Sequence, residues 1–204
     1  MFGSGGRPMT TGARFNLDKT SFLLVDDNTQ ALDIISQVVN GFGAKSITRC
    51  ESGEEARTLL SKQPFDVLLT DAQMPEPDGY ELIRWLRHEA GEPNRFIPAI
   101  IISGHVRMGQ VLKARDCGAS FTIAKPITPK IVLERLFWIA KDQRMFIDCG
   151  AYIGPDRRFK REGPPAGMEG RRADDAAGEI GEAASPNMSQ EEIDAMMKPN
   201  KVIL

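Results

Sequence analysis

The chain has 204 residues, enough for one ordinary domain with a remainder or for two small domains. Its net charge of −2 excludes a protein that binds nucleic acid through bulk positive charge. Three widely spaced cysteines form no metal-binding pattern, and no apolar run approaches the roughly 18 residues of a membrane span. We therefore expect a cytoplasmic protein with reduced thiols and no membrane insertion.

Residues 1–19 are rich in glycine and threonine and predict a flexible N-terminal arm. From about residue 20 to residue 141, short apolar runs alternate with amphipathic stretches. Runs this short, unbroken and rich in Val, Ile and Leu are typical of strands buried on both faces. The five predicted strands are Ser21–Val25, the weaker Lys45–Cys50, Phe65–Thr70, Ala99–Ser103 and Phe121–Ala124.

The stretches between these runs carry apolar residues at helical spacing. Strand and helix alternate five times, which predicts right-handed crossovers and one α/β, doubly wound parallel sheet with helices on both faces. The stripes are Ala31/Ile34/Ile35/Val38/Val39/Phe42, Ala56/Leu59/Leu60, Leu82/Ile83/Leu86, Val111/Leu112 and Val132/Leu136/Ile139.

The composition changes after this domain, and we assign residues 144–186 to an arginine-rich and then acidic tail. Residues 154–186 hold six glycines, four prolines and only three large apolar side chains, too few to bury a core. Residues 152–172 carry six Lys/Arg against three Asp/Glu, whereas residues 173–194 carry seven acids and no base. This switch of sign predicts a binding segment that becomes ordered on its ligand.

Residues 187–204 predict a short C-terminal amphipathic helix. Ser189 and Glu192 have the spacing of a capping box, and Ile193, Met196 and Met197 follow at helical spacing. So short a helix is marginal alone, so it needs a partner surface.

Polar residues stand at the carboxyl ends of the predicted strands, where open parallel sheets bind their ligands. Asp26 and Asp27 follow the first strand, Asp71 follows the third, Ser103 is the last residue of the fourth, and Lys125 follows the fifth. Three carboxylates on one rim repel one another, and a magnesium ion is the usual solution. With a lysine and a hydroxyl this is a phosphoryl-handling set, in which one carboxylate could form an acyl phosphate. Taken singly, each of these residues has an ordinary structural explanation.

The whole set resembles the receiver domain of CheY-like response regulators. The matching residues are the Asp26-Asp27 pair, the run from Asp71 to Gly79, Ser103, and Gly118-Ala119 leading to Lys125-Pro126. The resemblance covers about residues 20–142, and we place the receiver domain at 20–143. It implies a flavodoxin-like five-stranded sheet with strand order 2-1-3-4-5.

The resemblance also implies roles for these residues. Asp71 would take a phosphoryl group from a sensor histidine kinase, with Ser103 and Lys125 binding the phosphoryl oxygens. Magnesium would be held by Asp27, Asp71 and the main-chain carbonyl of Gln73, with Asp26 acting directly or through water. The Lys125–Pro126 peptide is expected to be cis.

Two positions depart from the family pattern. Thr122 stands three residues before Lys125, where the family usually has an aromatic switch residue, and Phe121 stands one position earlier. His105 is two residues beyond Ser103, and its alternatives are a place beside the phosphoryl group or an ordinary solvated loop position.

The basic part of the tail favours arginine over lysine five to one, which indicates bidentate or stacking recognition. Interleaved acids disfavour a duplex backbone and suit guanine, whose amino and N1–H groups donate to carboxylates. The tail resembles the extension of the Cle group of CheY-like proteins that bind cyclic di-GMP. A solubilising linker, RNA binding and acidic-lipid binding are the alternatives. The predicted ligand residues are Tyr152, Asp156, Arg157, Arg158, Phe159, Arg161, Arg171, Arg172 and Asp174.

The segment from Ser189 to Met197 resembles the peptide with which the flagellar motor switch protein FliM docks on receivers. Such a segment could fold back on this receiver or compete for another one. The sequence thus predicts a switch without enzymatic output that is phosphorylated on Asp71, binds cyclic di-GMP and tunes the motor, in the cytoplasm or at the flagellated pole. The alternative is a single-domain phosphotransfer receiver with a passive tail. A magnesium-dependent phosphatase is disfavoured because the acceptor follows the third strand.

Overall fold

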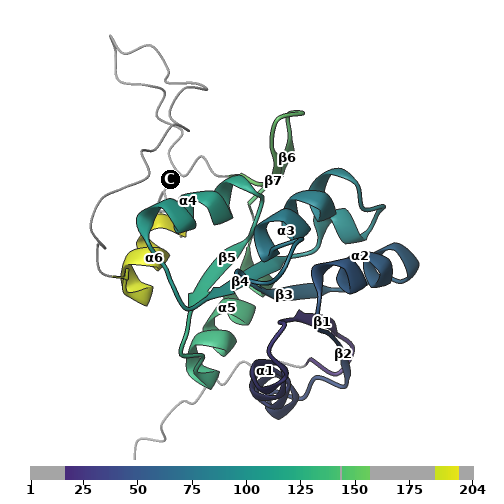
Figure 1. Cartoon of the computed structure of the whole chain (residues 1–204), viewed down its shortest axis with the longest axis vertical. Helices are drawn as coiled ribbons and strands as arrows, with labels where there is room; N and C mark the ends of the chain where they lie inside the picture. The colour runs from purple at the N-terminus through teal and green to yellow at the C-terminus, as the bar shows by residue number, and fades with distance from the viewer. Residues whose placement is uncertain (1–16, 143, 157–186, 198–204) are drawn as a thin grey trace, which may run out of the picture.

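The computed structural model describes residues 17–142, 144–156 and 187–197. Five parallel strands form one sheet in the order β2-β1-β3-β4-β5 (Figure 1). The predicted sheet and its strand order are therefore confirmed. The strands are β1 (Ser21–Val25), β2 (Ser46–Cys50), β3 (Val67–Asp71), β4 (Ala99–Ser103) and β5 (Phe121–Ala124).

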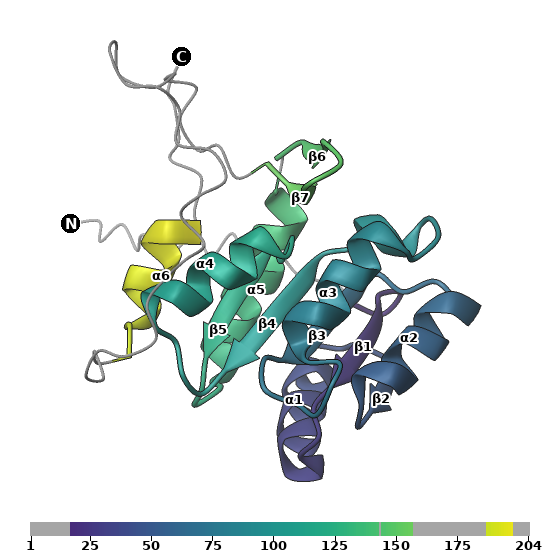
Figure 2. The ribbon, with the colours of Figure 1, turned by 45° about the horizontal axis from the view of Figure 1, so that its top comes forward.

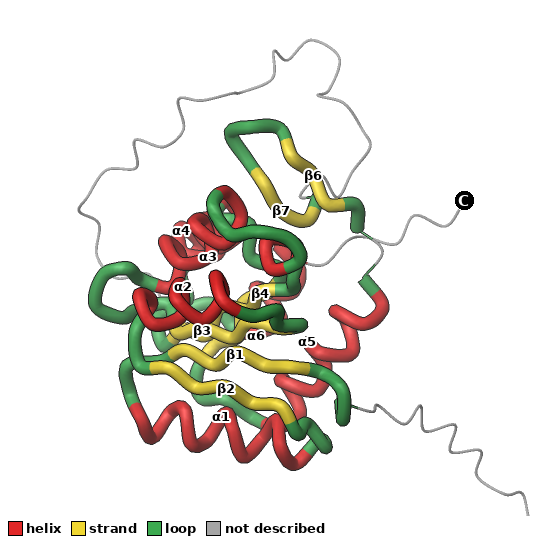
Figure 3. The backbone as a smooth tube through the Cα atoms, turned by 90° about the vertical axis from the view of Figure 1, so that its right-hand side faces the viewer, coloured by secondary structure: helices red, strands yellow, loops and turns green. Residues whose placement is uncertain are grey.

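Helices cover both faces of the sheet (Figure 3). Each strand sends alternate residues to opposite faces, so that Leu23 and Leu24 belong to different apolar clusters although both are fully buried. Each such buried side chain stabilises the fold by roughly 1.5–3 kcal/mol. One face carries α1 (Thr29–Gly41) and α5 (Pro129–Lys141), and the other carries α2 (Gly53–Lys62), α3 (Gly79–His88) and α4 (Met108–Asp116), with a short 3-10 turn, η1 (Asn94–Phe96), before β4.

The buried stripe of α1 differs from the predicted one. Leu32, Ile35 and Val39 are buried, whereas Ile34 is 52% exposed and Ala31 is half-buried. The α-helical turn of 3.6 residues brings the i, i+3 and i+7 positions to one side, and that side faces the sheet.

A hairpin extends the fold past the expected domain boundary. Strands β6 (Phe146–Asp148) and β7 (Ile153–Pro155) pair antiparallel beside α3 (Figure 3). The Phe146 ring packs edge-on against Phe96 at 5.1 Å, and the Asp156 N–H donates to the carbonyl of Met145 at 2.7 Å. The prediction that the tail starts at residue 144 is therefore wrong for residues 144–156, which belong to the folded unit.

The predicted C-terminal helix is present as α6 (Gln190–Met197). Its capping box is formed, because Glu192 accepts from the Ser189 N–H at 2.7 Å and the Glu192 N–H donates to Ser189 Oγ at 3.3 Å. The helix lies beside α4 at the outer edge of β5 (Figure 2). No helix within the three described ranges is long and apolar enough to cross a membrane.

Candidate functional site

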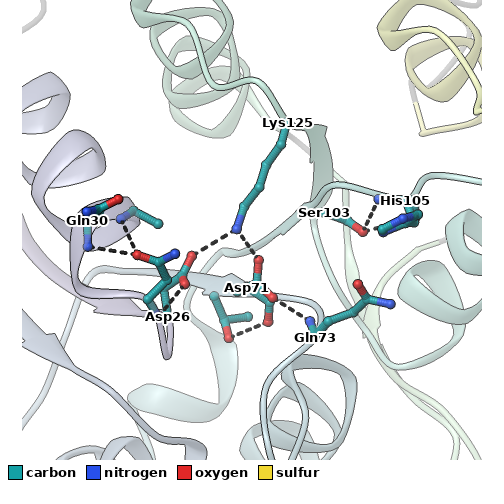
Figure 4. A network of polar contacts seen from close by, with 10 residues as sticks. Asp26, Gln30, Asp71, Gln73, Ser103, His105 and Lys125 are labelled. Carbon is teal, nitrogen blue, oxygen red and sulfur yellow. Dashed lines mark hydrogen bonds and ion pairs between the residues drawn. The ribbon is translucent and has the colours of Figure 1, made fainter.

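Asp71 is the last residue of β3, and its carboxylate is held from two sides (Figure 4). Oδ1 lies 2.5 Å from Nζ of Lys125, and Oδ2 accepts from the Gln73 N–H at 2.5 Å. The side chain is buried, with 7% of its surface exposed. The carboxylate therefore has a fixed orientation at the carboxyl edge of the sheet.

Lys125 connects the ends of three strands, because it follows β5 while its ammonium contacts the last residue of β3 and the residue after β1. Its Nζ lies 3.1 Å from Oδ2 of Asp26, a carboxylate that is only 1% exposed. Oδ1 of Asp26 accepts from the Asn28 N–H at 2.9 Å, which fixes the other half of this carboxylate. The Lys125–Pro126 peptide is cis, as predicted. The structure thus brings Asp26, Asp71 and Lys125 together as the sequence indicated (Figure 4).

The environment perturbs both charged partners. Burial raises the pKa of the Asp71 carboxyl, and the neighbouring charge of Asp26 adds to this, against the opposing effect of the Lys125 ammonium and the Gln73 N–H. Burial alone would lower the pKa of Lys125, but its hydrogen bonds and ion pairs with Asp71 and Asp26 outweigh burial and raise it. At neutral pH the ammonium therefore stays charged between the two acids.

The start of α3 packs directly on the main chain of Asp71. Asp78 caps the helix, accepting from the Glu81 N–H at 2.8 Å, and its own N–H donates to Glu81 at 3.1 Å. A Cβ on Gly79 would stand 1.9 Å from the carbonyl oxygen of Asp71. Only glycine allows this approach, so the predicted motif from Asp71 to Gly79 fixes the loop that follows the acceptor.

Ser103 closes β4 and is buried, but its hydroxyl is engaged with the following loop (Figure 4). Ser103 Oγ donates to the carbonyl of His105 at 3.0 Å and accepts from its N–H at 3.3 Å. His105 itself is exposed, which agrees with the solvated-loop alternative. The serine thus lies at the expected edge of the sheet, and its hydroxyl group donates its hydrogen bond to the following loop.

The predicted magnesium ligands are gathered only in part. Asp26 and Asp71 offer carboxylate oxygens within reach of one cationic group, whereas Asp27 and Gln73 are exposed. Among the residues that the structure describes, no three acidic, histidine or cysteine side chains form a ready metal cluster. The predicted donors are nevertheless all oxygen atoms, from three carboxylates and one main-chain carbonyl, which suits a hard divalent cation that keeps several waters.

The two atypical positions on β5 are both buried. Phe121 packs against Trp138 with ring centres 5.7 Å apart and is buried at the edge strand of the sheet. Thr122 faces the opposite side, and its hydroxyl has no hydrogen-bond partner in the described part of the chain.

The sequence analysis missed Arg135, a fully buried charge on α5. Its guanidinium stacks over Trp138 at 4.0 Å and is ion-paired with Asp194 of α6. The available signal was a charged residue next to Leu136, on the apolar stripe that faces the sheet and the C-terminal helix.

The predicted nucleotide ligands fall into two groups. Tyr152 is buried within the hairpin, and its hydroxyl donates to the carbonyl of Pro155 at 2.6 Å. Only 5% of the Tyr152 surface is exposed, so this predicted ligand residue is not open to a nucleotide in this conformation. Asp156 is half-buried at the end of the hairpin. Outside the described residues lie Arg157, Arg158, Phe159, Arg161, Arg171, Arg172 and Asp174.

Comparison with known proteins adds independent information. The family model of the response regulator receiver domain matches residues 22–137. A chemotaxis protein CheY homolog of Campylobacter jejuni is 33% identical over 115 residues, which are 56% of this chain and 87% of that protein. The chemotaxis protein CheY1 of Helicobacter pylori is 33% identical over 117 residues, covering 56% and 91%.

Solved structures show the same likeness. A putative response regulator from Chloroflexus aurantiacus matches with a TM-score of 0.56 and 26% identity, over 61% of this chain and all of that one. The receiver domain of a sensor histidine kinase from Pseudomonas aeruginosa matches with a TM-score of 0.54 and 26% identity, over 59% and 98%. That structure has a magnesium ion coordinated in its active-site cleft.

Proposed function

Because the chain belongs to the response regulator receiver family, we propose that Asp71 accepts a phosphoryl group from a phosphohistidine of a sensor histidine kinase. A receiver of this family is a signalling protein rather than an enzyme. One observation supports the acceptor assignment most directly: Lys125, at the end of β5, is ion-paired with both buried carboxylates, of Asp71 and of Asp26.

The geometry suits nucleophilic attack by Asp71. Its Oδ would form the new P–O bond while the P–N bond of the phosphohistidine breaks, with the electron pair returning to the imidazole. The ammonium of Lys125, already 2.5 Å from the carboxylate, would pair with the incoming phosphoryl oxygens. Ser103 would donate its hydroxyl to another phosphoryl oxygen, for which it must give up its bond to His105.

Magnesium is part of this proposal because the donors at the site fit it. Asp26, Asp27, Asp71 and the carbonyl of Gln73 would hold the ion, with water completing its shell. The bound ion would supply positive charge that offsets the repulsion between these carboxylates and the phosphoryl oxygens. The metal in the Pseudomonas receiver domain supports the same assignment here.

The test is phosphorylation of the full chain with a small phosphoramidate donor, followed by intact-mass analysis. We expect one added phosphoryl group that requires magnesium and is lost in Asp71→Asn. The Asp66→Asn variant is a matched control, since Asp66 caps the opposite end of the sheet by accepting from the Ser21 N–H at 2.8 Å. Normal phosphorylation of Asp71→Asn would contradict the proposal.

We further propose that the arginine-rich tail binds cyclic di-GMP. The support is the spacing of Arg157 and Arg161, the interleaved acids, and the hairpin, which fixes Asp156 immediately before the first arginine. Arg157 and Arg161 would pair with guanine O6 and N7 or with phosphate, and Phe159 would stack on a base. Tyr152 is omitted from this set because the hairpin buries it.

Calorimetry with cyclic di-GMP tests this part. Arg157→Ala and Arg161→Ala should each abolish measurable binding, while Lys160→Ala, a control for simple charge attraction, should change affinity only slightly. Equal losses in all three variants would indicate a nonspecific basic linker. Absence of binding by the unaltered chain would favour the alternative, a phosphotransfer receiver with a passive tail.

The output partner that we propose is a flagellar motor switch protein of the FliM type, in the cytoplasm. The support is the similarity to chemotaxis proteins named CheY and the amphipathic segment from Ser189 to Met197. Binding of the phosphorylated chain to a motor switch peptide, measured by fluorescence anisotropy, tests it. Equal anisotropy with a scrambled peptide would contradict it.

A further inference from the structure

The C-terminal helix α6 covers the outer edge of the sheet between α4 and α5. Ile193 is fully buried and Met197 nearly so, and both pack against Val106 and Val111. These residues form an apolar cluster separate from the two clusters that flank the sheet. Figures 1 and 2 both place α6 against α4 and β5, so a segment distant in sequence completes this face of the molecule.

Gln190 pairs with the exposed edge of β5 as a neighbouring strand would. Its Oε1 accepts from the Ala124 N–H at 2.9 Å, and its Nε2 donates to the Thr122 carbonyl at 3.1 Å. An edge strand otherwise presents such groups unpaired. The contact therefore requires, at this position of the helix, a side chain that has both a hydrogen-bond donor and an acceptor, as glutamine has.

A second directional contact is the ion pair between Asp194 and Arg135. The Arg135 side chain is 1% exposed, and a buried charge is costly unless an opposite charge meets it. In the described part of the chain, Nε and Nη1 of Arg135 and the hydroxyl of Thr122 lack hydrogen-bond partners. Docking of α6 thus gives the buried charge of Arg135 an opposite charge, while some polar atoms of this face stay without a partner in the described part of the chain.

The segment before α6 is tied to the backbone beside both residues proposed to bind the phosphoryl group. The Met188 N–H donates to the Val106 carbonyl at 2.7 Å, and Asn187 Nδ2 donates to the Gly104 carbonyl at 3.2 Å. Gly104 follows Ser103 directly. On the other side, Ala124, which donates to the side chain of Gln190, directly precedes Lys125.

We propose that residues 187–197 are a built-in helical ligand of this face and that phosphorylation of Asp71 releases it. The inference rests on the proposed role of Asp71. Ser103 has one hydroxyl proton, which now goes to His105; donating it to a phosphoryl oxygen breaks this bond and frees the loop that holds Asn187 and Met188. The Lys125 ammonium, which now contacts the Asp71 carboxylate, would shift to the added phosphoryl oxygens, and the accompanying main-chain shift would displace the adjacent Ala124 from Gln190.

The test uses the full chain with magnesium and beryllofluoride, which mimics a phosphoryl group on a carboxylate. Hydrogen exchange followed by mass spectrometry reports the protection of residues 190–197, and fluorine NMR reports bound beryllofluoride independently. We expect exchange in α6 to accelerate several-fold when beryllofluoride binds, with the central strands unchanged. In Asp71→Asn no bound fluoride and no acceleration are expected.

The two possible failures differ in their readout. A bound fluorine signal together with unchanged or slower exchange in α6 overturns the release of the helix and leaves the phosphoacceptor role intact. Absence of the bound fluorine signal in the unaltered chain contradicts both the release of the helix and the phosphoacceptor role of Asp71.

Thermodynamic linkage supplies a second readout. If beryllofluoride weakens the docking of α6, a substitution that weakens this docking must in turn raise the affinity for beryllofluoride. Asp194→Asn should therefore raise the affinity for beryllofluoride several-fold. Glu191→Gln removes the same charge from the exposed side of the same helix and should not change the affinity. Equal affinities of the Asp194 variant and the unaltered chain would contradict the coupling.

Discussion

Ile193→Ala tests the docking of α6 most sharply, because this side chain is fully buried although its helix lies near the end of the chain. The substitution removes three carbon atoms from the cluster with Val106 and Val111. At roughly 0.8 kcal/mol for each buried methylene, the docked state should lose about 2–3 kcal/mol. Since about 1.4 kcal/mol corresponds to a factor of ten, the docking constant should fall on the order of fiftyfold.

Because α6 can leave this face without opening the sheet, the lost docking free energy should affect α6 and its contacts but not the rest of the domain. Hydrogen exchange should become much faster at residues 190–197 and at Ala124, while the urea midpoint of the whole domain changes little. Ile34→Ala is a matched control, since it removes the same atoms from a side chain that is 52% exposed. Unchanged exchange in α6, or equal acceleration in the central strands, would refute the reasoning.

Three further predictions concern the site and its support. Burial raises the pKa of Asp71, so the folded state binds the carboxyl proton more tightly than the unfolded state does. Ionisation of Asp71 therefore lowers the free energy of unfolding; this loss of stability is complete above the folded pKa and absent below the ordinary pKa. Asp71→Asn should therefore raise the urea midpoint at neutral pH and lose this advantage in acid, and a lower midpoint at neutral pH would argue against it. Gly79→Ala places a Cβ 1.9 Å from the Asp71 carbonyl and should cost about 2–3 kcal/mol of stability by chemical denaturation, unlike Gly91→Ala, where nothing lies within 4 Å. Arg87 is fully buried and donates to three main-chain carbonyls, so Arg87→Met should cost about 3 kcal/mol in the same assay. A loss below about 1 kcal/mol would show that these hydrogen bonds do not stabilise the fold.

The strand order was predictable because regular alternation of strand and helix leaves few ways to build a parallel sheet, and the family resemblance selected one of them. The predicted parallel sheet also implied that Asp26, Asp71 and Lys125 lie close together, because the carboxyl ends of parallel strands share one edge. The burial pattern of α1 was less predictable. Ala31 and Ile34 satisfy helical spacing as well as Leu32 does, and only the position of the sheet decides which of them is buried.

The hairpin at residues 146–155 escaped prediction because its strands have three residues each, too few to show a period of two. Glycine and proline in the second strand also resemble loop composition. Its stability comes from contacts outside itself, such as Phe146 against Phe96, which local sequence does not report. For the same reason, local sequence does not distinguish a Tyr152 that packs in a hairpin from one that contacts a ligand.

The C-terminal helix illustrates a partial success. Its capping box and apolar stripe predicted both the helix and its need for a partner, but not which partner it finds. That answer depends on Gln190 matching the edge of β5 and on Asp194 matching Arg135, pairings that exist only once the sheet has formed.

The central claim is that Asp71 carries the phosphoryl group, and mapping the phosphorylated residue tests it most directly. After treatment with a phosphoramidate and magnesium, reduction of the acyl phosphate with borohydride and peptide mass spectrometry should mark Asp71. The Asp71→Asn chain should remain unmarked. Marking of Asp26 or Asp27 instead, or of no residue at all, would contradict the account.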